Sequence, residues 1–164
     1  MNFRIGMGYD VHRLAKGRPC VIGGVTFEHG SGPLGHSDGD VLLHAVCDAL
    51  LGAANLGDIG DHFPDTDAKF KNADSKKLLA HCYQLVTQKG YRLNNLDCVV
   101  VCERPKIKSR RDEIRKVLAE LLQVDEDAVS VKATTEEQLG FTGSGEGIAA
   151  WAYVSLLCCK STTL

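Results

Sequence analysis

The sequence predicts an α+β (mixed α/β) fold, with one mixed β-sheet covered by helices on one face, in a single domain spanning 1–164. Segments with strand and helix periodicity are interspersed along the chain, without a repeat, a low-complexity tract or a linker. Hydrophobic residues make up 44% and charged residues 24%, with a formal net charge of -2, which suits one compact core. The long apolar segment 148–157 indicates that further subunits cover the other sheet face.

The first element is a strand over about 3–12, because every second residue is apolar. The apolar positions are Phe3, Ile5, Met7, Tyr9 and Val11. Side chains of a strand alternate between its faces, so Asp10 and His12 point the same way, about two strand rises of ~3.3 Å apart. These two residues could hold one ion, although a solvated surface ion pair is the alternative.

The second element is a helix over about 38–54. Ser37 is followed three residues later by Asp40, a capping-box pattern that makes Ser37 the expected N-cap. His44 lies about two turns into this segment, with Asp40 and Asp48 four residues to either side. We expect these carboxylates to hold the second ring nitrogen of His44, as partners of metal-binding histidines do.

Asp10, His12 and His44 form a candidate metal site. One oxygen and two imidazole nitrogens suit zinc, and three protein ligands leave a fourth position for a substrate oxygen, as in catalytic zinc sites. A lone histidine beside apolar positions is more often a satisfied boundary residue than a ligand, so both interpretations stay open. His36 precedes the expected helix start, where an anion such as phosphate is favoured, or is a loop histidine without a role.

The remaining elements follow from turn signals and apolar runs. We expect a short hairpin at about 20–27, a helix at 75–89 between an Asp74 cap and Gly90, and a buried strand at 96–102. A helix at about 106–122 follows Pro105, and strands at 129–133 and 148–157 complete the fold.

Composition argues against several other classes. The seven cysteines are an odd, scattered set without a C-x-x-C pair, and are expected to be reduced, buried thiols of a cytosolic protein. The basic residues between 104 and 116 mostly decorate a helix, so no nucleic-acid partner is expected. No uninterrupted apolar stretch of about 18 residues occurs, so we expect no membrane partner and a cytoplasmic location.

Two polar loops are candidates for binding. The loop 57–67 is dense in carboxylates but does not fit an EF-hand, so it is either a solvated mobile loop or a lid that binds sugar hydroxyls. The stretch 132–147 carries hydroxyls, acids and glycines without the lysine spacing of a P-loop. Its threonines beside a carboxylate could bind phosphate oxygens and a hard cation such as magnesium.

Motifs spread over nearly the whole chain resemble the 2-C-methyl-D-erythritol 2,4-cyclodiphosphate synthase family of the non-mevalonate isoprenoid pathway. The motifs are GYDVH at 8–12, HSDGD at 36–40 with His44, GDIG at 57–60, FPDTD at 63–67, KATT at 132–135 and EQLGFTG at 137–143. Together, in order, they are far more specific than any one of them.

The resemblance implies a phosphorus–oxygen lyase that depends on divalent metal. Its substrate is 4-diphosphocytidyl-2-C-methyl-D-erythritol 2-phosphate, whose own 2-phosphate attacks the β-phosphorus, so that CMP leaves and a cyclic diphosphate forms. Because the substrate carries the nucleophile, no catalytic triad is needed, and phosphoryl transfer demands mainly positioning and charge stabilisation.

Carried over by position, Asp10, His12 and His44 bind Zn²⁺ or another divalent transition metal, and Glu137 binds Mg²⁺ or Mn²⁺ bridged to the substrate phosphates. His36 and Thr135 are the implied catalytic residues. Implied contacts are to the phosphates, to ribose (Asp58 and Gly60), to methylerythritol (63–67) and to cytosine (102–108). The implied substrate-binding residues are Asp10, His12, His36, Ser37, Asp58, Ile59, Gly60, Phe63, Pro64, Asp65, Thr66, Asp67, Cys102, Glu103, Arg104, Pro105, Lys106, Ile107, Lys108, Thr134, Thr135, Glu136, Glu137 and Phe141.

The resemblance also implies a homotrimer, with sheets packed together and each active site shared between two subunits. Ser144 departs from the arginine or lysine of many relatives near the central cavity, which puts isoprenoid diphosphate binding there in question. The residues alone are also compatible with two other functions. They are a zinc-dependent nucleotide phosphohydrolase, using metal-bound hydroxide, and a non-catalytic zinc- or nucleotide-binding module.

Overall fold

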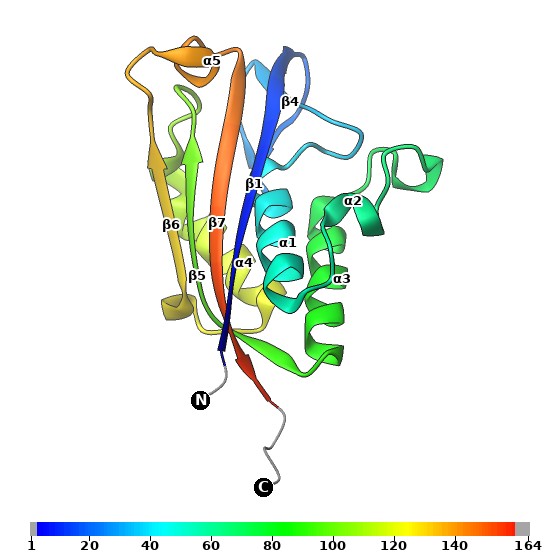
Figure 1. Cartoon of the computed structure of the whole chain (residues 1–164). Coiled ribbons are helices and arrows are strands. Elements are labelled where there is room, and N and C mark those ends of the chain that lie inside the picture. The colour runs from blue at the N-terminus through cyan, green and yellow to red at the C-terminus, as the bar shows by residue number, and fades with distance from the viewer. Residues whose placement is uncertain (1–2, 160–164) are drawn as a thin grey trace, which may run out of the picture.

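A five-stranded sheet with helices on one face forms the body of the protein (Figure 1), and the computed structural model describes residues 3–159. A second, two-stranded sheet lies beside it. The strands are β1 (Phe3–Lys16), β2 (Cys20–Ile22), β3 (Val25–Phe27), β4 (Ser31–Leu34), β5 (Tyr91–Val101), β6 (Val129–Thr134) and β7 (Gly147–Cys158). The α-helices are α1 (Val41–Ala54), α2 (Ile59–His62), α3 (Ser75–Gln88), α4 (Arg111–Leu122) and α5 (Gly140–Gly143). Short 3-10 helices are η1 (Ala68–Phe70), η2 (Ile107–Arg110) and η3 (Glu126–Ala128).

The sheet is mixed, as predicted. Its strand order is β4-β1-β7-β5-β6. β1 runs antiparallel to both β4 and β7, and β5 runs antiparallel to β7, whereas β5 and β6 are parallel. The parallel pair is joined by a crossover that contains α4, because parallel neighbours cannot be linked by a tight turn.

Two glycines of β1 let α1 lie directly against the sheet. A Cβ atom at Gly8 would come 1.9 Å from the carbonyl oxygen of Ala45, and one at Gly6 would come 2.0 Å from that of Ala49. Both oxygens belong to the backbone of α1, so only a residue without a side chain fits at either position. This close contact holds α1, and with it His44, against the strand that carries Asp10 and His12.

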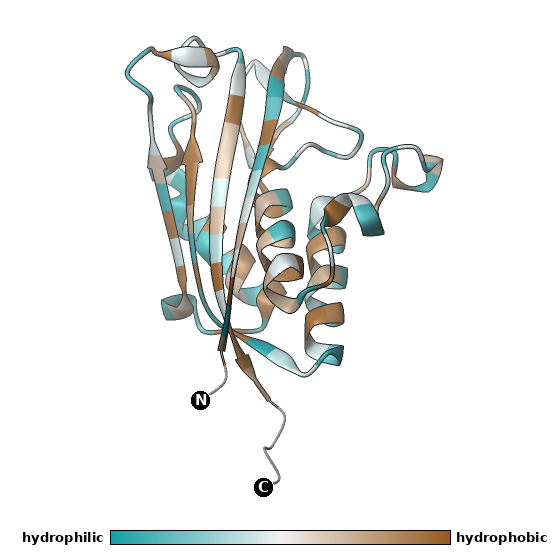
Figure 2. Cartoon of the chain, viewed as in Figure 1, coloured by the Kyte–Doolittle hydropathy of each residue, from teal (hydrophilic) through white to brown (hydrophobic). Residues whose placement is uncertain are grey.

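The apolar residues of β1 lie on the face of the sheet opposite the helices. Phe3 is 59% exposed, Ile5 68% and Met7 55%. Figure 2 shows hydrophobic residues recurring along β1 and β7, and Tyr153 of β7 adds to the same exposed set. The predicted alternation is therefore present, with glycines and the polar residues Asp10 and His12 towards α1 and the apolar side chains on the open face.

The prediction that Ser37 caps the first long helix is wrong. α1 begins at Val41 and its N-cap is Asp40, whose side chain accepts hydrogen bonds from the backbone N–H groups of Leu42 and Leu43. Gly39 has a φ of 75°, a left-handed conformation that cannot continue a right-handed helix, so the helix cannot extend back to Ser37. The hydroxyl of Ser37 instead accepts a hydrogen bond from the N–H of Gly39.

Other element boundaries shift modestly. The predicted helix over 106–122 is divided into η2 and α4, because the backbone at Arg110 leaves the helical region. The strand β1 is longer than predicted, because it gains pairing with β4, a strand that the sequence did not indicate. The helix expected at 75–89 is confirmed as α3, with Asp74 as its N-cap.

The cysteines are free, and most of them are buried. Cys20, Cys47, Cys82, Cys98 and Cys102 lie in the interior. The expectation that all seven are buried is wrong at the end of the last strand, where Cys158 is partly exposed and Cys159 is exposed. Within residues 3–159, no helix combines the length and the apolar character needed to cross a membrane.

Candidate metal centre and adjoining cavity

The side chains of Asp10, His12 and His44 converge on one point between β1 and α1. The Oδ2 atom of Asp10 lies 2.9 Å from Nε2 of His12 and 3.0 Å from Nδ1 of His44. The two histidine nitrogens are 3.2 Å apart. The strand alternation thus brings Asp10 and His12 to one face, and the packing of α1 adds the third side chain.

The spacing of these three atoms fits a tetrahedral divalent metal. Ligand atoms about 2.0–2.1 Å from a tetrahedral zinc lie about 3.3 Å from one another, close to the separations seen here. A carboxylate oxygen and two ring nitrogens at this distance turn lone pairs towards the same point, which a shared cation stabilises. The donor set, one oxygen with two imidazoles, also suits a divalent transition metal.

Each histidine is oriented through its other ring nitrogen. Nδ1 of His12 lies 3.0 Å from the carbonyl oxygen of Leu34, which accepts its proton and leaves Nε2 with a free lone pair. Nε2 of His44 lies 2.8 Å from the hydroxyl of Ser75 and 3.1 Å from that of Ser37.

The prediction that Asp40 and Asp48 orient His44 is wrong. Both Oδ atoms of Asp40 are used by backbone donors, since Oδ1 accepts from the N-terminus of α1 and from Gly23, while Oδ2 accepts from Gly24. The carboxylate of Asp48 accepts from the N–H of Ile59 at 2.8 Å instead. The four-residue spacing places both carboxylates within reach of His44. They instead accept hydrogen bonds from backbone N–H groups that would otherwise have no partner.

The charge state of the cluster follows from its partial burial. In the metal-free protein, burial raises the pKa of Asp10, but hydrogen bonds and charge interactions with the rings of His12 and His44 outweigh this effect and lower it to about 2. Burial tends to lower the pKa of His12, and the contacts with Asp10 reverse this and raise it. Asp10 is therefore anionic at neutral pH, as a carboxylate that could bind a cation must be.

A cavity of about 650 Å³ opens beside the candidate metal centre. His12 and His44 form part of its wall, and it is also lined by the first predicted loop and by the segment before α1. The lining residues are His12, Leu34, Gly35, His36, Ser37, His44, Ile59, Gly60, Phe63, Pro64, Asp65, Thr66, Phe70 and Leu78.

His36 lies in this cavity wall for a different reason from the predicted one. It stands four residues before the N-cap of α1, and the first amides of that helix are already bound by Asp40, so no free helix terminus lies beside it. Its Nε2 atom is 3.3 Å from the carbonyl oxygen of Asp67, and its own carbonyl accepts the N–H of Asn72. These bonds tie the segment before α1 to the end of the 57–67 loop.

The loop 57–67 forms one wall of the cavity. Asp58 caps the short helix α2, where Asp58 and Asp61 form a reciprocal capping box. The ring of Phe63 packs edge-on against Phe70, with ring centroids 5.2 Å apart, and against His81. These contacts bring Ile59, Gly60 and residues 63–66 to the cavity.

The remaining predicted residues form a second cluster, at the ends of β5 and β6. The hydroxyl of Thr135 donates to Oε1 of Glu137 at 3.0 Å, and the N–H of Gln138 lies 3.4 Å from Oε1 of Glu103. Arg104, Pro105 and Lys106 line a separate hollow with Phe27, Glu28, His29, Ser109 and Arg110. No residue of 102–108 or 134–141 lines the cavity beside the metal centre. Within one subunit the metal centre lies at β1 and the second cluster at the ends of β5 and β6, with β7 between β1 and β5 (Figure 1).

Glu136 and Phe141 lie in the same turn as this second cluster. Glu136 accepts a hydrogen bond from the hydroxyl of Thr142, so its carboxylate is engaged within the loop. Phe141 is 44% exposed. Glu137 and Gln138 both have a positive φ, at 51° and 66°, a strained arrangement of the kind often found at functional sites.

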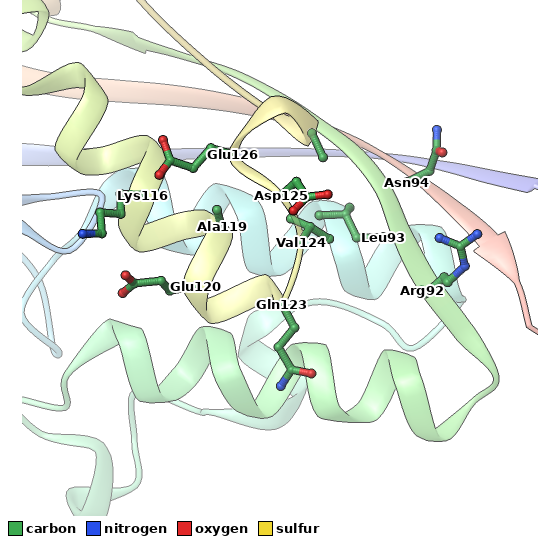
Figure 3. A pocket seen from close by; sticks show the side chains of 11 residues that line it. Arg92, Leu93, Asn94, Lys116, Ala119, Glu120, Gln123, Val124, Asp125 and Glu126 are labelled. Atoms are coloured by element: carbon green, nitrogen blue, oxygen red, sulfur yellow. The ribbon is translucent and has the colours of Figure 1, made fainter.

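A larger hollow near the end of α4 is a weaker candidate site (Figure 3). Its charged side chains are of both signs, namely Arg92, Lys116, Glu120, Asp125 and Glu126, so the hollow has no field of one sign. None of the residues that the motifs indicated lines it.

Ser75 is the functional candidate that sequence reasoning missed. Ser75 is the first residue of α3, next to the predicted cap Asp74, and it is fully buried. Because serine is common at the start of a helix, neither the residue type nor the position of Ser75 indicates a contact with His44, which is 31 residues away.

The family model described as the YgbB family matches residues 3–157. The chain belongs to the YgbB family. A curated relative from Geobacillus kaustophilus, named 2-C-methyl-D-erythritol 2,4-cyclodiphosphate synthase, is 60% identical over 154 residues, or 94% of this chain and 98% of the relative. This similarity confirms the resemblance drawn from the motifs.

Solved structures have the same fold as this YgbB chain. The bifunctional IspDF from Campylobacter jejuni matches with a TM-score of 0.91 and 45% identity, over 94% of this chain and 42% of that chain. The CDP complex of IspF from Plasmodium falciparum matches with a TM-score of 0.85 and 33% identity, over 97% of this chain and 98% of that chain. The mixed α/β fold predicted from the sequence is therefore confirmed.

Proposed function

We propose that this chain converts 4-diphosphocytidyl-2-C-methyl-D-erythritol 2-phosphate to 2-C-methyl-D-erythritol 2,4-cyclodiphosphate and CMP. The observation that carries the proposal is the three-ligand cluster of Asp10, His12 and His44, which opens onto a cavity lined by His36, Ser37 and the 57–67 loop. The names of the curated relatives support the same reaction. The whole chain acts as one catalytic domain of 1–164.

The reaction is an intramolecular phosphoryl transfer. An oxygen of the 2-phosphate forms a bond to the β-phosphorus, the bond from that phosphorus to the oxygen bridging the α- and β-phosphates breaks, and CMP leaves with that oxygen. No water is consumed. The protein therefore has to fold the substrate and stabilise phosphate charge rather than supply a nucleophile.

Asp10, His12 and His44 hold the first divalent metal, which we propose is zinc and which supplies positive charge to the diphosphate. His36 and Ser37 lie in the same cavity wall and donate hydrogen bonds to phosphate oxygens. Ile59, Gly60 and Asp58 bind the ribose side, and residues 63–67 enclose the methylerythritol.

Thr135 and Glu137 act from the second cluster. Their side chains are hydrogen-bonded to each other, so the carboxylate of Glu137 is already oriented to hold a second ion, Mg²⁺ or Mn²⁺. The hydroxyl of Thr135 stabilises the transferring phosphate, and the segment 102–108 binds the cytosine.

A homotrimer brings the two clusters together. In one subunit no residue of the second cluster lines the cavity beside the metal centre, so we propose that the second cluster of a neighbour completes the site. The apolar residues exposed on the open sheet face, with Ile5 at 68%, support packing of subunits through that face. A cytoplasmic location stays a prediction.

The test is turnover of the purified protein with Zn²⁺ and Mg²⁺ in oxygen-18 water. Phosphorus NMR should show the cyclic diphosphate and CMP in equal amounts, without oxygen-18 in either product. Oxygen-18 in a linear phosphate product would instead establish the zinc phosphohydrolase. Zinc or nucleotide binding without release of CMP would establish a non-catalytic module.

A further inference from the structure

The buried hydroxyl of Ser75 lies between the metal-site histidine and a carboxylate. Ser75 is the first residue of α3 and has no exposed surface. Its Oγ atom lies 2.8 Å from Nε2 of His44 and 2.5 Å from Oδ1 of Asp38. The other carboxylate oxygen of Asp38 accepts the backbone N–H of Ser75 at 3.1 Å.

The direction of these hydrogen bonds follows from what each group can donate. An ionised carboxylate only accepts, so the single hydroxyl proton of Ser75 goes to Asp38. The oxygen of Ser75 then has only lone pairs to offer His44, and it must accept a proton from Nε2. His44 is therefore held as the tautomer that carries its proton on Nε2, with the lone pair of Nδ1 facing Asp10 and His12.

A second hydroxyl near His44 belongs to the cavity. The Oγ atom of Ser37 lies 3.1 Å from Nε2 of His44 and accepts the N–H of Gly39, also at 3.1 Å. The single Nε2 proton of His44 is shared between Ser75, the closer acceptor, and Ser37, so both contacts of Ser37 use its lone pairs and its own proton is not needed by either. Because Ser37 lines the cavity, this proton can be donated to a bound phosphate.

We infer that Asp38 and Ser75 are positioning residues that present His44 to the metal through Nδ1 and leave the hydroxyl of Ser37 free for the substrate. This inference rests on the metal centre of the proposed function. The carboxylate–hydroxyl–imidazole chain replaces the direct carboxylate–histidine contact common in metal sites. A purely structural role for Ser75, as a small residue that fits a buried helix start, gives different results in the experiments below.

The first experiment is nitrogen-15 NMR of the histidine rings in the zinc-loaded full-length protein. His44 should coordinate through Nδ1, with a slowly exchanging Nε2 proton that shows a nuclear Overhauser effect to the β-protons of Ser75. His12 is the internal control, because its Nδ1 proton is held by the carbonyl of Leu34 and should be protected in every variant. Coordination of His44 through Nε2 in the wild type would overturn the inference without any mutation.

The second experiment is the zinc dissociation constant of Ser75→Ala, measured by competition with a chelating indicator. It should rise about 10- to 100-fold, and the Nε2 proton of His44 should exchange faster while the Nδ1 proton of His12 does not. The matched control is Thr87→Ala, which removes an exposed hydroxyl from the last turn of the same helix and should leave zinc binding unchanged. The free energy of unfolding of each variant, measured in EDTA, shows whether the metal-free fold has also changed.

Asp38→Asn tests whether the carboxylate acts through Ser75. We expect a similar weakening of zinc binding, and little further loss when Asp38→Asn is combined with Ser75→Ala, because both break the same chain. Wild-type zinc affinity in Ser75→Ala, or fully additive losses in the double variant, would overturn the inference alone. A wild-type protein that binds no zinc would instead refute the metal centre itself.

Discussion

Adding a single methyl group at Gly8 should both destabilise the fold and move the residues of the metal centre apart. In Gly8→Ala the new Cβ atom would lie 1.9 Å from the carbonyl oxygen of Ala45 and 2.7 Å from the backbone nitrogen of Ala49. Since both atoms belong to the backbone of α1, no side-chain rotation relieves the contact. A carbon–oxygen contact needs about 3.2 Å, so α1 and β1 must separate by about 1.3 Å, at a cost of about 1–3 kcal/mol or more.

The same displacement should reach the metal ligands. Asp10 and His12 follow Gly8 on β1, whereas His44 belongs to α1, next to Ala45, and their donor atoms are now 2.9–3.2 Å apart. Metal sites tolerate changes of about 0.2 Å in ligand distance, so a shift of about 1.3 Å exceeds what the site can absorb. We expect zinc affinity to fall more than about 10-fold, with a similar loss of CMP release.

The assay combines urea unfolding in EDTA with zinc titration of the folded protein. Gly6→Ala is a useful comparison, because it meets α1 at 2.0 Å one turn further from His44 and should cost similar stability. Gly52→Ala is the matched control, since that glycine lies in α1 with nothing within 4 Å of the added Cβ. It should stabilise the helix by about 0.5–1 kcal/mol and leave zinc binding unchanged. Wild-type unfolding and wild-type zinc affinity in Gly8→Ala would refute the reasoning.

Three further predictions concern the metal, the assembly and the thiols. His44→Ala should lose zinc and nearly all turnover while its circular dichroism in EDTA matches that of the wild type; turnover retained after removal of the metal would disprove the role of the ion. Ile5→Glu should reduce the mass measured by light scattering to that of one chain and abolish CMP release, whereas an unchanged mass would show that the open sheet face is not the subunit interface. Burial raises the pKa of Cys98 and Cys102 to about 12, so both stay protonated at pH 9; a thiol reagent should modify exposed Cys159 in the native protein and reach the other two only after denaturation, and their rapid labelling in the native state would contradict the structure.

Much of the site could be predicted because its signals are local or carried by motifs. Alternation in the first strand places Asp10 and His12 on one face without any knowledge of the rest of the chain. The residue types already indicated His44 as a third ligand beside Asp10 and His12, with a satisfied boundary histidine left open as the alternative, and the family resemblance then favoured the ligand. The helix prediction around His44 was correct in type, although its start was misplaced by the unrecognised left-handed Gly39.

The partners of the buried polar groups could not be predicted in the same way. Asp40 and Asp48 had the right spacing to reach His44, yet each carboxylate is bound by backbone donors from other segments. Ser75 had no distinguishing signal, and it reaches His44 only because α3 packs beside α1. Nor does any local pattern show that the two clusters lie on different parts of one subunit.

By itself, the sequence determined the alternating strand, the long helices, the mixed fold and the family. These features depend on periodicities within one element, or on motifs, and both can be recognised without knowing distances between elements. Only the tertiary structure decided which hydroxyl orients His44, which side chains cap α1 and which residues share a cavity. The physical reason is that hydrogen bonds form over about 3 Å, so their partners are chosen by packing between segments that lie far apart along the chain.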